Sequence, residues 1–221
     1  MDKLSLPWPV STPCTINQAF GVNGAYYQAN GINILGHNGL DINTYHGQPV
    51  YASHDGYALY EIDDKQGHGI TIRSKEQALL FGKPSFYKTV YWHICDPTKE
   101  PKYASPLWKK KEVEVKMGDL IGYADNTGLS TGDHLHFALK PIAQNAKKKW
   151  YNTRQNNGYG GCIDPSFYMS KFSAPSLIIA SNVVEMTENI LVHVQELPVE
   201  SQNPPLKGLL GILDTLARWL R

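Results

Sequence analysis

The clearest alternation of polar and hydrophobic positions lies in residues 134–139, which read His-Leu-His-Phe-Ala-Leu. Successive side chains of a β-strand point to opposite faces of its sheet. The alternation therefore predicts a strand that packs an apolar face on a core and presents His134 and His136 side by side on the other face. The preceding residues 127–132, Thr-Gly-Leu-Ser-Thr-Gly, are typical of a tight turn.

Short apolar segments separated by turn residues continue through most of the first 170 residues. This pattern predicts a mainly β fold, an antiparallel sheet or sandwich. Residues 47–52 and 57–62 flank the turn-like His-Asp-Gly at 54–56 and are expected to pair as a hairpin. In the segment Val-Tyr-Trp-His-Ile at 90–94, the alternation places Val, Trp and Ile toward the core and His93 on an exposed face.

The last sixteen residues follow a different pattern, because leucines recur there at helical spacing with charged side chains between them. They predict an amphipathic helix at 206–221. We expect either a helix docked on its own domain or a sister subunit, or an interfacial helix that contacts a membrane or another partner. The residues that would make this contact are Leu209, Leu213, Trp219 and Leu220.

The chain has 221 residues, 42% of them hydrophobic, and a net charge of only +1. The length and composition indicate a folded chain with one large domain over residues 1–170, a connector of uncertain structure over 171–205 and the helix at 206–221. The small net charge argues against nucleic-acid binding. The sequence has no apolar run long enough for a spanning helix and no visible signal peptide, and we expect a monomer.

Two further side chains that can bind metals stand four residues apart, at His37 and Asp41. Zinc is commonly held by histidine nitrogen and carboxylate oxygen, and catalytic zinc sites use about three protein ligands. His37, Asp41 and either His134 or His136 would make such a set. The alternative is that these are ordinary surface or core histidines. We interpret the remaining four histidines, at positions 46, 54, 68 and 193, as surface or turn residues.

The combination of motifs resembles the lysostaphin/LytM family of zinc endopeptidases, which cut peptide bonds in peptidoglycan. The resemblance covers about residues 15–142. It rests on Gln-Ala-Phe-Gly at 18–21, Gly-His-Asn-Gly-Leu-Asp at 36–41, Trp-His at 92–93 and the run from Thr127 to Phe137. The fold that it implies is an antiparallel β-sheet groove with one zinc ion at its floor.

The resemblance also implies roles for single residues. His37, Asp41 and His136 would hold the zinc, while His134 and His93 would be catalytic histidines that are not ligands. The family also places a tyrosine upstream of the first zinc histidine. Tyr26 and Tyr27 are the candidates for this substrate-binding position.

The activity implied is a zinc-dependent endopeptidase that acts on bacterial peptidoglycan at the cell wall. The alternatives are a catalytically inactive wall-binding or regulatory relative, and a zinc hydrolase of another peptide or amide. A phage-type antimicrobial lysin released at lysis and a secreted bacterial enzyme without its leader are both consistent with the sequence. The bond that is cut remains open: a glycine bridge, a D-Ala–diaminopimelate crosslink or a stem-peptide bond.

Overall fold

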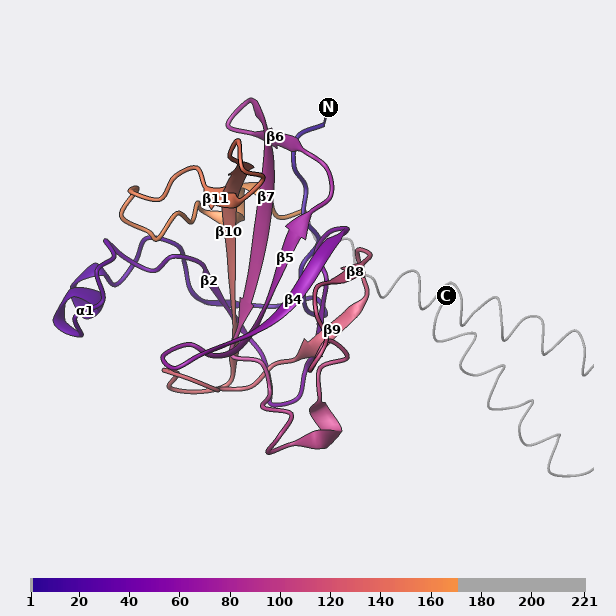
Figure 1. Cartoon of the computed structure of the whole chain (residues 1–221). Coiled ribbons are helices and arrows are strands. Elements are labelled where there is room, and N and C mark those ends of the chain that lie inside the picture. The colour runs from indigo at the N-terminus through magenta and orange to yellow at the C-terminus, as the bar shows by residue number, and fades with distance from the viewer. Residues whose placement is uncertain (1, 171–221) are drawn as a thin grey trace, which may run out of the picture. The chain divides into compact units, whose positions relative to one another are not determined.

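A computed structural model describes residues 2–170, and a long antiparallel sheet runs through them (Figure 1). The main path of this sheet is β1-β2-β10-β7-β5-β4-β8, with β6 added to β7 and β11 added to β10, and β3 and β9 form a second sheet. The mainly β, antiparallel fold is therefore confirmed. The strands are β1 Ile16–Gln18, β2 Leu40–Asn43, β3 Pro49–Tyr51, β4 Gly56–Asp63, β5 Gly67–Ser74, β6 Ala78–Leu80, β7 Lys83–Trp92, β8 Val113–Val115, β9 Leu120–Tyr123, β10 His134–Gln144 and β11 Trp150–Asn152, and the helical segments are α1 Gly24–Ala29, η1 Pro101–Tyr103 and η2 Pro165–Tyr168.

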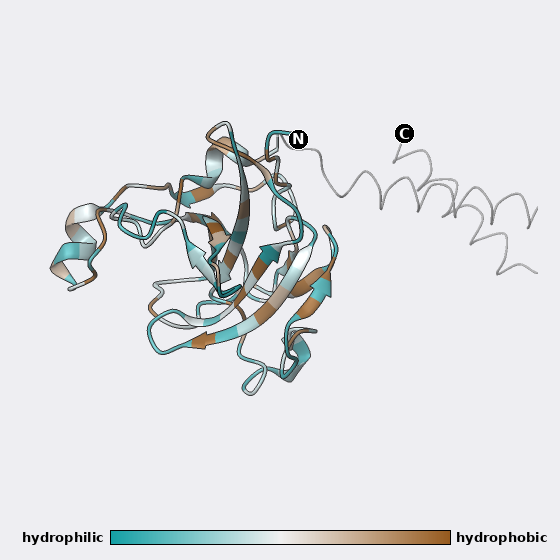
Figure 2. Cartoon of the chain, turned by 45° about the horizontal axis from the view of Figure 1, so that its top comes forward, coloured by the Kyte–Doolittle hydropathy of each residue, from teal (hydrophilic) through white to brown (hydrophobic). Residues whose placement is uncertain are grey.

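Strand β10 lies at the centre of the fold, between β2 and β7. The expected alternation is confirmed, because Leu135, Phe137 and Leu139 have no exposed surface while His134 and His136 lie on the opposite face. Figure 2 shows the same alternation of hydrophobic and hydrophilic positions along the strands. Burial of a large apolar side chain contributes roughly 1.5–3 kcal/mol. The apolar face of β10 therefore holds the histidine face in place.

The segment at residues 2–10 contributes to the core. Leu4, Leu6 and Val10 are buried among the strands. The backbone of Leu6 donates to the carbonyl of Tyr168 at 2.7 Å and accepts from the amide of Ser170 at 2.7 Å. The two ends of the described chain are thus hydrogen-bonded to each other. Local sequence patterns do not indicate this long-range contact.

The expected orientation of the side chains of β7 toward the main core is wrong. Tyr91 is fully buried in the core, and Val90 and Trp92 lie on the opposite face, in a second cluster with Ala138. Strand β7 ends at Trp92, and His93 has a left-handed backbone with φ of 65°. His93 is only 7% exposed, so it does not lie on an open sheet face. Within β7 the alternation itself holds, but the face that packs on the main core is the one that carries Tyr91. At His93 the alternation fails, because the rule holds only while the strand continues.

The hairpin expected over residues 47–62 is also wrong. Strand β3 pairs with β9, and β4 pairs with β5 and β8. The intervening residues carry the chain from one sheet to the other. A local turn signal cannot distinguish such a crossing from a hairpin, because the choice depends on which distant strand offers free backbone groups.

The predicted connector at 171–205 and helix at 206–221 lie outside the described residues, as do the contact residues Leu209, Leu213, Trp219 and Leu220. Within residues 2–170, no helix has the length and apolar character needed to cross a membrane. The three cysteines, Cys14, Cys95 and Cys162, are all free thiols.

His54 lies in the turn between β3 and β4, which is one of the two expected positions, but its side chain is buried and not at the surface. Its Nδ1 donates to the Asp55 carbonyl at 2.9 Å, and its Nε2 lies 2.9 Å from Thr89 Oγ1. Because the Asp55 carbonyl can only accept, Nδ1 carries the hydrogen of the neutral ring. Burial lowers the pKa of His54 from 6.5 to about 4.

This pKa shift predicts an acid-sensitive contribution to stability. The unfolded chain takes up the His54 proton near pH 6.5 and the folded chain only near pH 4, so the free energy of unfolding falls as the pH drops between these values. Between pH 7 and pH 5 the loss from this group amounts to about 2 kcal/mol. Urea unfolding of the metal-free protein and of His54→Gln at both pH values measures it. An equal loss in the two proteins would contradict the assignment.

Candidate active site

Strands β2 and β10 bring the two predicted clusters together. Their register places Asp41 directly opposite His136, and His37 precedes β2 by a short turn. Opposed side chains in an antiparallel pair have Cβ atoms about 4.5–5.5 Å apart, within reach of a common ligand. Gly39 permits the approach, because a Cβ at this position would lie 2.7 Å from the His136 ring and 2.6 Å from the Phe137 carbonyl.

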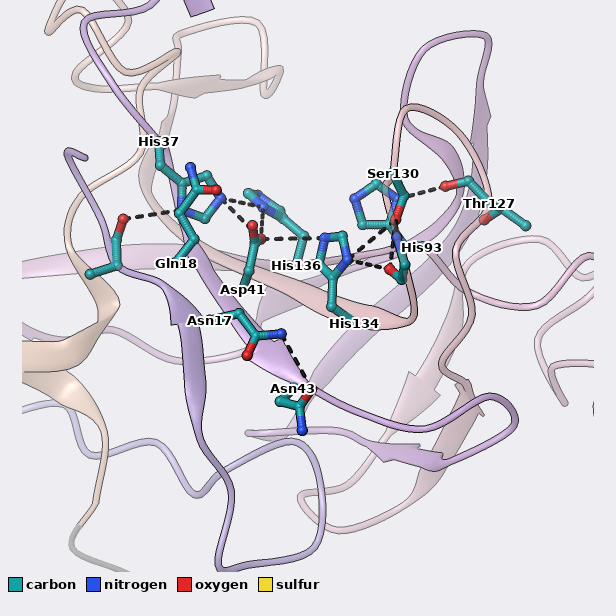
Figure 3. Close-up of polar contacts among 12 residues, drawn as sticks. Asn17, Gln18, His37, Asp41, Asn43, His93, Thr127, Ser130, His134 and His136 are labelled. Carbon is teal, nitrogen blue, oxygen red and sulfur yellow. Dashed lines mark hydrogen bonds and ion pairs between the residues drawn. The ribbon is translucent and has the colours of Figure 1, made fainter. Parts of the chain in front are cut away.

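Three ligand atoms form a nearly equilateral triangle (Figure 3). His37 Nε2 lies 3.0 Å from Asp41 Oδ1, His136 Nδ1 lies 3.0 Å from the same oxygen, and the two nitrogens are 2.9 Å apart. His37 Nδ1 donates to the Ala19 carbonyl at 3.2 Å, so its lone pair lies on Nε2, toward the triangle. A lone-pair nitrogen facing a carboxylate oxygen at this distance is repulsive unless a proton or a metal cation lies between them.

The triangle fits a zinc ion. Ligand atoms at about 2.0–2.1 Å from tetrahedral zinc are roughly 3.3 Å apart, only a few tenths of an ångström more than the distances here. Two histidines and one aspartate match the donor set of a catalytic zinc site, which leaves a coordination position open. His37, Asp41 and His136 are thus the residues that could hold a metal.

Burial and hydrogen bonding keep Asp41 and His136 in the charge states that a cation requires. Burial alone would raise the pKa of Asp41, but hydrogen bonds and charge interactions with His136 and His37 outweigh it and hold that pKa well below its usual range. Burial lowers the pKa of His136, which favours the neutral imidazole. A carboxylate beside two neutral imidazoles is the ligand form of all three residues.

His134 and His93 lie beside the triangle, with their ring centroids 4.5 Å apart. His134 Nδ1 donates to the Gly132 carbonyl at 2.8 Å, and His93 Nδ1 donates to the Thr127 carbonyl at 2.6 Å (Figure 3). Because a carbonyl oxygen only accepts, each Nδ1 carries the hydrogen and each neutral ring keeps its lone pair on Nε2. His134 Nε2 lies 3.6 Å from Asp41 Oδ1, so this lone pair is next to the metal position.

The left-handed backbone of His93 is what turns its ring into the site. Residues with positive φ other than glycine are uncommon, and they cluster at functional sites. The His93 carbonyl accepts from the Asp125 amide at 2.7 Å, which helps to hold this conformation. Burial, with the nearby imidazoles, lowers the pKa of His93 to about 4, so its ring is neutral at neutral pH.

The structure separates the two tyrosine candidates, although both line the same cavity. The Tyr27 ring is parallel to the His37 ring with centroids 6.2 Å apart, while Tyr26 is 51% exposed and packs edge-on against Tyr27. The Gln18 amide donates to the Tyr27 hydroxyl oxygen at 2.8 Å. Burial and the Asp41 charge raise the pKa of Tyr27 to about 12, so its hydroxyl keeps the proton.

The cavity over the site has a volume of about 550 Å³. Apart from Lys65, Asp41 and the four histidines of the site, its polar side chains are neutral amides and hydroxyls. Sequence reasoning assigned no role to Gln18 or to the carbonyls of Thr127 and Gly132. A backbone carbonyl leaves no side-chain signal in a sequence, and only the folded chain shows where it points.

The family to which the chain belongs follows from its sequence match. Residues 35–149, just over half of the chain, match peptidase family M23. The chain is a member of peptidase family M23.

Similar proteins include other M23-type peptidases. The chain is 34% identical over 109 residues to the peptidoglycan DD-endopeptidase ShyB of Vibrio cholerae. This match covers 48% of this chain and 21% of that protein. It is 30% identical over 104 residues to the DD-carboxypeptidase/endopeptidase Mpg of Neisseria meningitidis, covering 47% of this chain and 20% of the relative. The M23 chain thus spans about a fifth of the length of these curated relatives.

Solved structures of similar proteins include a zinc containing peptidase from Vibrio cholerae, which is 25% identical with a TM-score of 0.47 and covers 68% of this chain and 39% of that one. The catalytic domain of lysostaphin from Staphylococcus simulans is 22% identical with a TM-score of 0.41, and the match covers 60% of this chain and 77% of that domain.

The geometry makes a prediction about metal binding that separates His37 from His134. His37→Gln removes a triangle atom and is expected to lower the zinc content of the protein by one equivalent. His134→Gln is the matched control, because its ring is anchored to Gly132 outside the triangle, and it should retain all the zinc. Elemental analysis after dialysis against a low zinc concentration measures both. Equal zinc loss in the two variants would contradict the assignment.

Proposed function

We propose that this M23 chain is a zinc-dependent endopeptidase that hydrolyses peptide bonds in bacterial peptidoglycan. The observation that carries the proposal is the triangle of His37, Asp41 and His136, with His134 and His93 beside it, each anchored through Nδ1 to a backbone carbonyl. Family membership and the endopeptidase names of similar proteins support the substrate class. We propose further that the enzyme acts at the bacterial cell wall, as a released lysin or as a secreted enzyme.

The lining of the cavity suits an uncharged peptide. Amide and hydroxyl side chains can pair with the N–H and C=O groups of a peptide backbone without the cost of burying unpaired charges. Short, weakly charged stem or bridge peptides of peptidoglycan have this chemistry. A cavity of about 550 Å³ accommodates several residues of such a peptide across the metal position.

His37, Asp41 and His136 would hold the zinc ion, which supplies Lewis acidity toward the scissile carbonyl and lowers the pKa of water to about 7. His134 then serves as the general base. Its Nε2 lone pair faces the metal position, and the Gly132 carbonyl fixes the tautomer by accepting from Nδ1. The positive charge that His134 acquires with the proton lies close to the Asp41 carboxylate, which stabilises it.

His93 and Tyr27 complete the proposed machinery. His93, neutral and turned toward His134, can exchange a proton with it and pass that proton to the leaving amine. Tyr27 keeps its hydroxyl hydrogen, and because Gln18 already donates to the hydroxyl oxygen, this hydrogen is free to point to the substrate. We propose that it donates to the developing oxyanion.

The decisive test is digestion of purified sacculi. The wild-type protein should release soluble muropeptides with new free amines, and mass spectrometry of these products identifies the bond that is cut. His134→Gln should reduce the rate roughly 100- to 10,000-fold, the usual contribution of general acid–base catalysis, while its zinc content stays unchanged. Release of muropeptides that persists in a strong chelator, or at the wild-type rate in His134→Gln, would refute the proposal.

The role of Tyr27 has a separate test. Tyr27→Phe removes the hydroxyl and keeps the ring on His37, so kcat should fall roughly 100- to 1,000-fold, as for loss of one oxyanion donor, with little change in KM. Tyr26→Phe is the matched control and should stay near wild-type activity, because Tyr26 is largely exposed. An equal loss in both variants, or a change confined to KM, would assign Tyr27 to substrate binding instead.

A further inference from the structure

A second cluster of side chains that can bind metals lies next to the backbone segments that carry His93 and His134. His46, Cys95 and Asp125 each offer a ligand atom, and these atoms lie within 4.8 Å of one another. None of the three belongs to the active-site triangle. Cys95 is fully buried, and Asp125 is 7% exposed.

Backbone hydrogen bonds hold the three segments of this cluster together. The amide of Cys95 donates to the Tyr123 carbonyl at 2.8 Å, and the amide of Gly47, next to His46, donates to the Ala124 carbonyl at 2.8 Å. The amide of Asp125 donates to the His93 carbonyl at 2.7 Å. The three side chains therefore start from a fixed frame, which is the condition for a preorganised metal site.

The two nitrogens of His46 have different partners. Nδ1 lies 3.0 Å from Asp125 Oδ1 and 4.0 Å from Asp133 Oδ1, while Nε2 lies 2.8 Å from Glu100 Oε2. Metal-bound histidines almost always donate their second ring N–H to a carboxylate, a carbonyl or water, which fixes the ring. Glu100 is placed for this role when Nδ1 is the ligand.

The charges of the cluster attract a cation. One imidazole faces three carboxylates, those of Glu100, Asp125 and Asp133, and within residues 2–170 no lysine or arginine pairs with any of them. These side chains line a cavity of about 590 Å³ that also receives Asp96 and Lys99, which pair with each other at 3.7 Å. A cavity lined mostly by one sign of charge raises the local concentration of the opposite ion.

We propose that His46 Nδ1, Cys95 Sγ and the Asp125 carboxylate form a second metal site, for zinc or a similar divalent cation, with Glu100 orienting the histidine. Thiolate, imidazole and carboxylate together are a donor set typical of zinc and cobalt. The Nδ1–Oδ1 distance of 3.0 Å is already near the separation of about 3.3 Å expected around tetrahedral zinc. Binding releases the Cys95 thiol proton to solvent, since the thiolate is the ligand.

The position of this site gives it a structural role. The Asp125 carbonyl accepts from the His134 amide at 3.3 Å, and the Asp125 amide donates to His93, so a metal held by Asp125 would stabilise the backbone on which both catalytic histidines stand. Glu100 lies in the long loop between Cys95 and Lys111. The metal would therefore also link this loop to the segment between Asp125 and His134.

Cobalt distinguishes the two sites, because only the second contains sulfur. The full chain, stripped with a chelator and titrated with Co²⁺, should bind two equivalents and develop a thiolate-to-cobalt charge-transfer absorption in the near ultraviolet. His37→Gln should lose one equivalent and keep the absorption. Cys95→Ser should lose one equivalent together with the absorption. The matched control is Cys14→Ser, which should keep both.

Two more variants test the proposal even if Cys95→Ser does not fold. Asp125→Asn should weaken the cobalt equivalent that carries the absorption, and Glu100→Gln should weaken it roughly 10- to 100-fold, as expected for loss of a ligand-orienting partner. Far-ultraviolet circular dichroism checks the fold of each variant. A wild-type chain without the absorption, or an absorption unchanged in both Asp125→Asn and Glu100→Gln, would overturn the proposal. These outcomes are independent of peptidase activity and of the triangle, which the zinc content of His37→Gln tests separately.

Discussion

The pairing of β2 with β10 is the constraint on which the rest of the site depends. Asp41 faces His136 only in the observed register, and a slip of one residue would turn one of them toward the core. The opposite faces of the same strands prevent this slip, because Ile42 and Leu135 pair there and are fully buried. Packing of the hydrophobic core on one face of the sheet thus fixes the strand register. This register in turn sets the spacing of the three candidate ligand atoms on the other face.

A second layer of control comes from backbone groups between Asp125 and His134. The carbonyls of Thr127 and Gly132 decide which ring nitrogen of His93 and His134 is free. Their positions depend on the turn and on the left-handed conformation of His93 more than on any side chain. Asp125, in the cluster with His46 and Cys95, is joined by backbone hydrogen bonds to both His93 and His134, so the two clusters share one segment of backbone.

Predictions from the sequence succeeded for features set by local strand geometry. They failed for features set by contacts with residues distant in the sequence. The alternation in β10 correctly placed His134 and His136 on one face, because each residue there obeys the strand geometry. It misplaced His93, because the strand stops one residue earlier and a positive φ redirects the ring. It also paired β3 with β4, which in fact pair with different strands, and it did not predict that the side chain of the turn residue His54 is buried against Thr89.

From the sequence alone, the residue types of the site, their division into two clusters and the mainly β character of the chain could be determined, since these follow from side-chain chemistry and from periodicity along the strands. Spacing alone could not choose between His134 and His136 as the partner of Asp41. Tertiary structure decides this, with Nδ1 of His136 at 3.0 Å and Nε2 of His134 at 3.6 Å from the carboxylate. The strand register and the backbone hydrogen bonds that produce this difference join residues almost a hundred positions apart, and no local pattern contains them.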